Sequence, residues 1–247
     1  MRTRCFGVKP LAFHVFAVST AQSLAYALDQ NRTLVKRSAL LASLVLVAAC
    51  PRGPDPNAQI APLPNRPLAG LAGQQVIVIP AHYIRPGDSL GWADMLERRT
   101  PALADVDDEI AFALGERGFR TRWVFPEQLI RSAQRNAAHS PDPRALAAEG
   151  LRPLARRRSD GQLGEPLASQ LRSLVALHGA RYALFPVELR FEKIGGAGRA
   201  VLHVLLLDAR LSRATWGGDV RGDTASTYGR GVIASVANNL ADLIAAP

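Results

Sequence analysis

One segment near the N-terminus limits which part of this chain can fold into a domain. Lys36 and Arg37 precede an uncharged run, residues 38–49, which ends in two alanines followed by Cys50. A basic start, an apolar run and small residues before a cleavage point are typical of an export signal. The run is too short to cross a hydrocarbon core of about 30 Å, which needs about 20 residues. We therefore expect residues 35–49 to be removed and the folded part to follow Cys50.

The residues before Cys50 resemble the lipobox of bacterial lipoproteins. Leu46 and Val47 stand at the aliphatic positions of that motif, and Ala48 and Ala49 stand at its small positions. The resemblance implies that a signal peptidase cuts between Ala49 and Cys50 and that the Cys50 thiol carries a lipid. It also implies a periplasm-facing protein of the cell envelope that is held in a membrane by this lipid, and we expect the outer membrane.

Residues 1–34 stand in front of this signal, although a signal peptide normally begins a chain. We expect them to be an extension that results from a start codon assigned too early. The alternative is a signal of their own, with Arg2, Arg4 and Lys9 ahead of an apolar stretch at 11–18. Both interpretations place these residues outside the folded domain.

The leader carries much of the positive charge of the chain. All 247 residues include 30 Lys and Arg against 21 Asp and Glu, a net charge of +9. Six basic residues and one acidic residue precede Cys50, which leaves 24 and 20 and a net charge of +4. A mildly basic domain lacks the charge excess of typical nucleic-acid-binding proteins, so we expect no nucleic-acid partner.

The segment after Cys50 is rich in proline. Proline fixes φ and removes a backbone donor, and the segment has few large apolar residues, so it should be extended and without a core. We expect residues 50–73 to be a tether that holds the domain away from the membrane. The prolines are Pro51, Pro54, Pro56, Pro62, Pro64 and Pro67.

Hydrophobic patterns predict one α/β domain over residues 74–247. The run 76–79 is continuously aliphatic, which is typical of a strand buried on both faces. Apolar residues at spacings of three and four predict a helix from Thr100 to Gly118. Alternating large and polar residues then predict a strand at 119–125.

The second half of the domain adds a strand meander. An irregular insertion at 137–165 separates it from the first half, and a short helix is expected earlier, at 92–98. The further predicted elements are helices at 127–136, 166–179 and 225–246 and strands at 182–194, 199–209 and 214–221. We therefore predict an α/β fold with a mixed sheet of about five strands, packed with helices in three layers.

This order of elements resembles the N-terminal domain of the Tol-system protein TolB. The same domain occurs in the curli-secretion lipoprotein family and in lipoprotein activators of penicillin-binding proteins. The resemblance is carried by the opening Val76–Pro80, the helix-to-strand passage Leu177–Leu184, and the ending Leu207–Arg210 with Trp216–Gly218. It implies a scaffold rather than a particular chemistry.

The densest basic cluster lies in the irregular insertion. It comprises Arg152, Arg156, Arg157 and Arg158. A solvated loop is the simpler interpretation, and the alternative is a contact with an acidic partner protein, a phosphate or a lipid headgroup.

Few residues after Cys50 form catalytic or metal-binding patterns. The histidines are His82, His139, His178 and His203, with no two at ligand spacing, and lipidation of Cys50 would leave no free thiol. We expect His178 to be a cation at a helix C-terminus and His203 to lie on the polar side of a strand. We expect the helical carboxylates Asp105, Asp107, Asp108 and Glu109 to form a solvated face. The sequence thus predicts no catalytic residue, no metal and no cofactor.

Two functions remain compatible with these patterns. We favour a lipid-anchored, non-enzymatic module that binds or assembles with another envelope protein. The alternative is an envelope hydrolase or small-ligand-binding lipoprotein whose site is formed by the loops at 81–99 and 137–165. The first of these loops carries His82, Tyr83, Arg85, Asp88 and Trp92.

Overall fold

The structure is a computed structural model. It describes residues 66–96, 98–152 and 161–245. The predicted signal peptide with its cleavage point Ala49–Cys50, and the arginines Arg156, Arg157 and Arg158, lie outside these ranges. No helix within these ranges is both long enough and apolar enough to cross a membrane.

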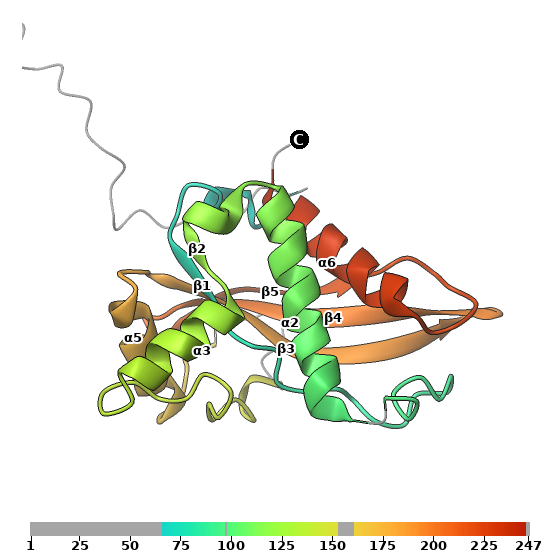
Figure 1. Ribbon diagram of the computed structural model, residues 1–247, viewed down its shortest axis with the longest axis horizontal. Helices are drawn as coiled ribbons and strands as arrows, with labels where there is room; N and C mark the ends of the chain where they lie inside the picture. The colour runs from blue at the N-terminus through green and yellow to red at the C-terminus, as the bar shows by residue number, and fades with distance from the viewer. Residues whose placement is uncertain (1–65, 97, 153–160, 246–247) are drawn as a thin grey trace, which may run out of the picture. The chain divides into compact units, whose positions relative to one another are not determined.

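A five-stranded mixed sheet with the order β2-β1-β3-β4-β5 forms the centre of the fold (Figure 1). β1 runs parallel to β2 and β3, whereas β3, β4 and β5 form an antiparallel meander. The strands are β1 Val76–Val78, β2 Trp123–Val124, β3 Tyr182–Ile194, β4 Ala197–Asp208 and β5 Arg213–Arg221. The predicted α/β class with a mixed sheet of about five strands is confirmed.

Helices cover both faces of this sheet. They are α2 Arg99–Glu116, α3 Pro126–Arg135, α5 Leu167–Leu177 and α6 Arg230–Ile244. Val76 and Val78 belong to the core that α2 and α6 complete, whereas Ile77 belongs to the core of α3 and α5. Successive side chains of a strand point to opposite faces, so β1 must be apolar at every position.

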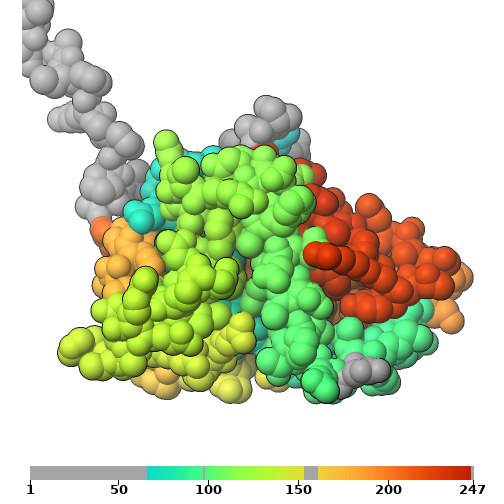
Figure 2. All heavy atoms as spheres, in the orientation of Figure 1, coloured from blue at the N-terminus to red at the C-terminus, as the bar shows by residue number. Residues whose placement is uncertain are grey.

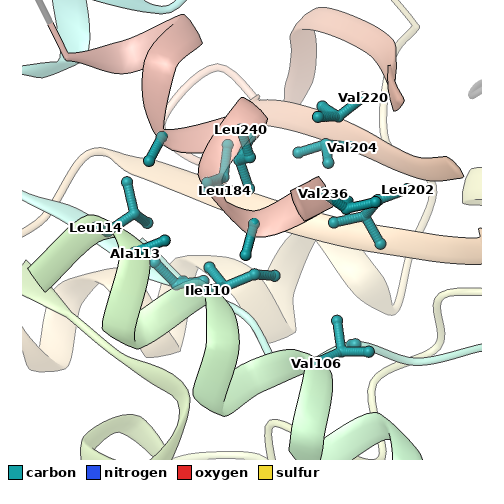
Figure 3. Close-up of a cluster of buried hydrophobic side chains, with 14 of the residues drawn as sticks. Val106, Ile110, Ala113, Leu114, Leu184, Leu202, Val204, Val220, Val236 and Leu240 are labelled. Atoms are coloured by element: carbon teal, nitrogen blue, oxygen red, sulfur yellow. The ribbon is translucent and has the colours of Figure 1, made fainter. Parts of the chain in front are cut away.

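The first core lies beneath α2 and α6, which are side by side on the molecule (Figures 1 and 2). Its side chains come from both helices and from β3, β4 and β5 (Figure 3). Prominent members are Val106, Ile110, Ala113 and Leu114 of α2, Val236 and Leu240 of α6, and Leu184, Leu202, Val204 and Val220 of the sheet. The apolar spacing along α2 therefore marks its buried face, as predicted.

The second strand is shorter than the sequence predicts. Gly118, with a φ of 87°, ends α2 in the left-handed conformation that favours glycine. The chain then forms a 3-10 turn, η3 Phe119–Thr121, before β2. Phe119 packs on Trp123, with 5.0 Å between the ring centroids, so only the end of the predicted strand pairs with β1.

The last helix begins at Arg230, later than the sequence predicts. The backbone N–H and C=O of Ala225 are bonded to Gly198 of β4, both at 2.8 Å, which prevents a helix from starting there. Gly198 itself is required by close packing, since a Cβ at this position would lie 2.6 Å from the Trp92 ring.

The segment at 92–98 forms turns in its described part and no helix. The Asp88 carboxylate accepts the backbone N–H groups of Leu90, Trp92 and Ala93, which fixes the loop from a side chain. Leu68 and Leu71, within the stretch predicted as the tether, are buried in the core of α2 and α6. Ordered packing thus begins before residue 74.

β3 contains a bulge between Pro186 and Glu188. Leu184 and Leu189 both belong to the core of α2 and α6, although their odd spacing would place them on opposite faces of a regular strand. Val187 packs on the opposite face with α3 and α5. The extra residue thus restores the apolar face of β3 in its second half.

Candidate binding sites

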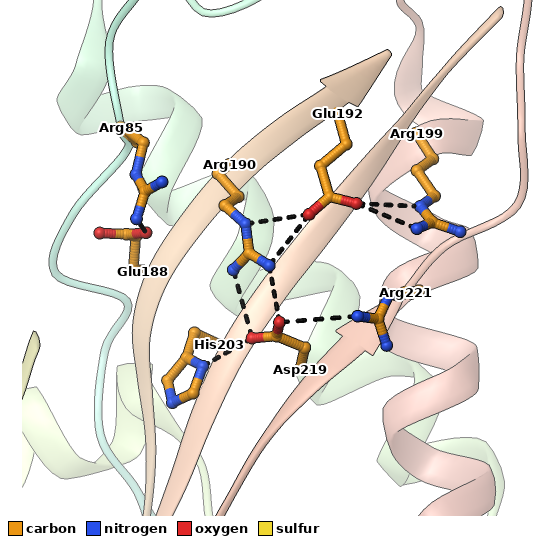
Figure 4. Close-up of polar contacts among 8 residues, drawn as sticks. All are labelled: Arg85, Glu188, Arg190, Glu192, Arg199, His203, Asp219 and Arg221. Carbon is orange, nitrogen blue, oxygen red and sulfur yellow. Dashed lines mark hydrogen bonds and ion pairs between the residues drawn. The ribbon is translucent and has the colours of Figure 1, made fainter. Parts of the chain in front are cut away.

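Charged side chains cover the part of the sheet that extends beyond α3 and α5. On β4, Leu207 and Leu205 belong to the core of those helices, and the alternation of the strand places His203 and Arg199 on the same face. This face therefore changes from apolar to ionic along the strands. We call the group Arg190, Glu192, Arg199, His203, Asp219 and Arg221 the ionic face (Figure 4).

Arg190 lies at the centre of the ionic face. Its guanidinium donates to both carboxylate oxygens of Asp219, at 2.6 and 3.2 Å, and to Glu192 at 3.0 Å (Figure 4). Glu192 also accepts from Arg199 at 3.0 Å. Paired bonds from one guanidinium fix both distance and orientation, so these charges are held in defined positions.

His203 is buried and supports Asp219 from within the sheet. Its Nδ1 donates to Asp219 at 2.6 Å, and its Nε2 has no partner within the described residues. Burial raises the pKa of Asp219, but hydrogen bonds from Arg190 and His203 outweigh this effect and lower it to about 2. Asp219 is thus ionised over the physiological pH range.

The loop after β1 adds an ion pair beside the ionic face. The N–H of Arg85 donates to the Leu189 carbonyl and the N–H of Leu189 donates to the Tyr83 carbonyl, both at 2.9 Å, so the loop runs along β3. This pairing brings the Arg85 guanidinium to 2.5 Å from Glu188 (Figure 4). Glu188 is buried at the bulge, and the guanidinium satisfies its charge.

Sequence reasoning missed the ionic face, although one signal was present. Glu188, Arg190 and Glu192 alternate in charge at a spacing of two, which on a strand places all three on one face. The side chains remain accessible in part, with Arg221 53% and Glu192 31% exposed. The arrangement offers fixed, partly exposed charges for binding.

A cavity of about 270 Å³ lies between the loop after β1 and the insertion. Its wall includes His82, Tyr83 and Val187 on one side and Arg144, Glu149 and Arg152 on the other. The two loops of the alternative hypothesis thus meet at one cavity. Of the other residues named for that hypothesis, Arg85 pairs with Glu188, Asp88 caps its own loop, and Trp92 is buried.

Polar contacts order part of the cavity wall. The Arg152 guanidinium carbon lies 3.9 Å from the centre of the Tyr83 ring. The His82 Nδ1 donates to the Pro80 carbonyl at 2.7 Å, and burial lowers the pKa of His82, so this ring is neutral at pH 7. Arg152 is therefore the member of the predicted arginine cluster that the structure assigns to a cavity.

The expectation of a solvated face is wrong for Asp107 and Glu109, which are both buried. Asp107 accepts the backbone N–H of Ala81 at 2.7 Å, and Glu109 pairs with Arg230 of α6 at 2.6 Å. Burial raises the pKa of Asp107 to about 7, although the Ala81 hydrogen bond and the charge of Arg144 act in the opposite direction. These carboxylates face the packed side of α2.

His178 also differs from its predicted role as a cation at a helix end. Its Nε2 lies 2.7 Å from the buried Ser132 hydroxyl of α3. Burial and the nearby charge of Arg135 lower the pKa of His178, which favours the neutral ring at pH 7. Within the described ranges, no three His, Cys, Asp or Glu side chains are grouped so that they could hold a metal ion.

No protein-family model and no curated protein matches this chain. Several solved structures are similar to it at low identity, among them the following three. The PelC dodecamer from Paraburkholderia phytofirmans is 14% identical, over 71% of this chain and 91% of that chain, with a TM-score of 0.35. The LpoB C-terminal domain from Salmonella enterica is 13% identical, over 60% and 82%, with a TM-score of 0.32. Lipoprotein GNA1162 from Neisseria meningitidis is 14% identical, over 64% and 88%, with a TM-score of 0.29.

All three TM-scores lie below 0.5 and all three identities below 25%. The similarities therefore establish neither a family nor a function for this chain. The resemblance of its sequence to TolB-type domains stays a prediction.

Proposed function

We propose that this chain is a lipoprotein of the cell envelope whose α/β domain binds or assembles with another envelope protein and has no enzymatic activity. A lipid on Cys50 anchors it, most simply in the outer membrane, and the proline-rich segment between Cys50 and Leu68 lets the domain reach a partner in the periplasm. The lipobox at Leu46–Cys50 supports the anchor. The ionic face is the observation that supports protein binding.

A rigid, mixed-charge surface suits protein recognition. Arg190 and Asp219 hold each other in place, so a partner need not order these side chains on binding. Arg199 and Arg221 lie toward the exposed side of the same network. Charges at such a rim steer association and select against partners with the wrong charge pattern.

Crosslinking and affinity capture of the native lipidated protein from membranes test this proposal. Replacing Arg199 and Arg221 together with glutamate should reduce capture of the specific partner by roughly tenfold, and the wild-type capture should weaken as salt increases. The matched control reverses Arg120 and Arg131, which are exposed and lie outside the ionic face. Equal capture by both double variants, with both folded, would contradict the proposal.

The cavity favours the small-ligand arm of the alternative function over its hydrolase arm. Among the residues that the structure describes, its lining includes His82 and Glu149 but no serine, threonine or cysteine that could act as a nucleophile. A purified protein that hydrolyses an ester, phosphate or cell-wall substrate, and loses this turnover in a folded His82→Ala variant, would overturn the non-enzymatic proposal.

A further inference from the structure

We propose that the cavity between the loop after β1 and the insertion binds a small carboxylic acid that also carries an ammonium or hydroxyl group. Amino acids, short peptides and hydroxy acids have this chemistry. The site uses His82, Tyr83, Arg144, Glu149 and Arg152 and no residue of the ionic face. Binding of such an acid would therefore be a function in addition to protein binding.

Two arginines provide the attraction for a carboxylate. Arg144 and Arg152 both line the cavity, and neither has an ion-pair partner among the described residues. In contrast, Arg85 and Arg181 each lie within 2.7 Å of a carboxylate oxygen. A guanidinium presents several N–H donors in one plane, which matches the two oxygens of a carboxylate.

Tyr83 orients one of these arginines. The guanidinium carbon of Arg152 lies 3.9 Å from the ring centre, so the cation packs on the ring face. Packing on the ring restricts the rotamers of Arg152 and leaves its N–H groups available at the edge of the plane. The arginine is thus partly ordered before a ligand enters, which reduces the entropy lost on binding.

Glu149 distinguishes this cavity from a simple anion site. Its carboxylate shares the cavity wall with Arg144 and Arg152, and no cation pairs with it within the described residues. A carboxylate accepts hydrogen bonds and repels further negative charge. It therefore selects a ligand with a donor near its acid group and disfavours a phosphate dianion.

The remaining wall is neutral and limits the size of the ligand. The His82 ring packs on Phe185, with 4.9 Å between the ring centroids, and Val187 is apolar. The volume of about 270 Å³ is smaller than that of most drug-sized pockets, roughly 300–1,000 Å³. It suits a single amino acid or a dipeptide.

Calorimetric titration of the purified full chain in detergent tests the site with six probes. Alanine and lactate carry both groups, propionate lacks the donor, ethylamine lacks the acid, and inorganic phosphate is a polyanion. We expect saturable binding of alanine or lactate, about tenfold weaker binding of propionate, and no binding of ethylamine or phosphate. Alanylalanine tests whether the cavity prefers a longer ligand of the same class.

Variants assign the binding to named residues. Arg144→Ala and Arg152→Ala should each weaken binding of the preferred acid by about tenfold or more. Glu149→Gln should remove the preference for alanine over propionate, and because Glu149 is exposed this variant tests the site even if an arginine variant does not fold. Arg131→Ala, on α3 and outside the cavity, is the matched control and should leave binding unchanged.

Several results would overturn the proposal. These are no saturable binding of any acid up to about 50 mM, phosphate binding tighter than every carboxylate, or unchanged binding after a folded Arg144→Ala and Arg152→Ala double substitution. The charge reversals at Arg199 and Arg221 should not affect these titrations. A failure of the ionic-face experiment would therefore not change the result of these titrations, and the two proposals can fail separately.

Discussion

The buried carboxylate Asp107 should make the stability of the domain fall as the pH rises. This residue is 6% exposed, and burial raises its pKa from 3.8 to about 7 in the folded state. Between these two values the folded protein binds a proton that the unfolded chain has lost, so increasing pH favours unfolding. The contribution is fully favourable below pH 3.8 and is lost progressively as the pH rises through 7.

The two pKa values set the size of this effect. A separation of about three units corresponds to ~4 kcal/mol at pH 8, and roughly 2–3 kcal/mol of it should develop between pH 5 and pH 8. Asp107→Asn removes the titration and keeps an oxygen that can accept the Ala81 N–H. The variant should therefore be more stable than the wild type at pH 8 and lose this part of the pH dependence.

Urea unfolding of the purified protein from pH 5 to pH 8 measures the difference between the two stability curves. Other titrating groups affect wild type and variant alike, so their contribution cancels in this difference. Asp105→Asn is the matched control, because Asp105 is an exposed carboxylate on the same helix and is not among the groups that shift the pKa of Asp107. Parallel curves for wild type and Asp107→Asn would refute the reasoning.

Four further results are expected. Cys50→Ala should abolish labelling by a fatty-acid analogue and leave an unprocessed precursor, and persistent labelling would exclude Cys50 as the lipidated residue. Val78→Asp should cost several kcal/mol in thermal unfolding, because it puts an unpaired charge into a fully buried strand; a normal melt would show that β1 is not buried. Asp219→Asn should lower the free energy of unfolding by about 1–2 kcal/mol at pH 7, after allowance for solvent screening of a partly exposed group. This difference should vanish as the pH falls from 4 through 2, because the wild-type carboxylate is then protonated too. An equal difference at pH 2 would point to packing instead. Gly198→Ala should lower the melting temperature because its Cβ would meet Trp92, and an unchanged value would show that the ring moves aside without cost.

Local patterns in the sequence were sufficient to predict most strands of the sheet. β3 coincides with the predicted strand 182–194, and β4 and β5 begin within two residues of prediction, because β3 and β4 are long, largely apolar runs joined and followed by short turns. The start of α6 was not predictable in this way. It depends on the pairing of Ala225 with Gly198, which are distant in sequence. Local sequence patterns that mark the start of a helix contain no information on such a contact.

The binding sites were predictable only in part, for the same physical reason. The loops that meet at the cavity could be proposed from their composition, and Arg152 could be identified as a candidate contact. Whether Asp107 is solvated or buried depends on which side of α2 faces the loop after β1. The ionic face joins Arg190 of β3 to Asp219 of β5 across the intervening β4, so it exists only once the strand register is known.

The bulge in β3 lets this strand lose one residue without changing which side chains face the core. Val187 is the extra residue, because Pro186 pairs with Val204 and Glu188 pairs with the next residue of β4, His203. Deleting it would leave a spacing of four between Leu184 and Leu189, which keeps both on one face of a regular strand, and would keep β3 and β4 in register. Homologous chains with this architecture should therefore tolerate the loss of one residue at the bulge, at the cost of the packing of Val187 on the opposite face.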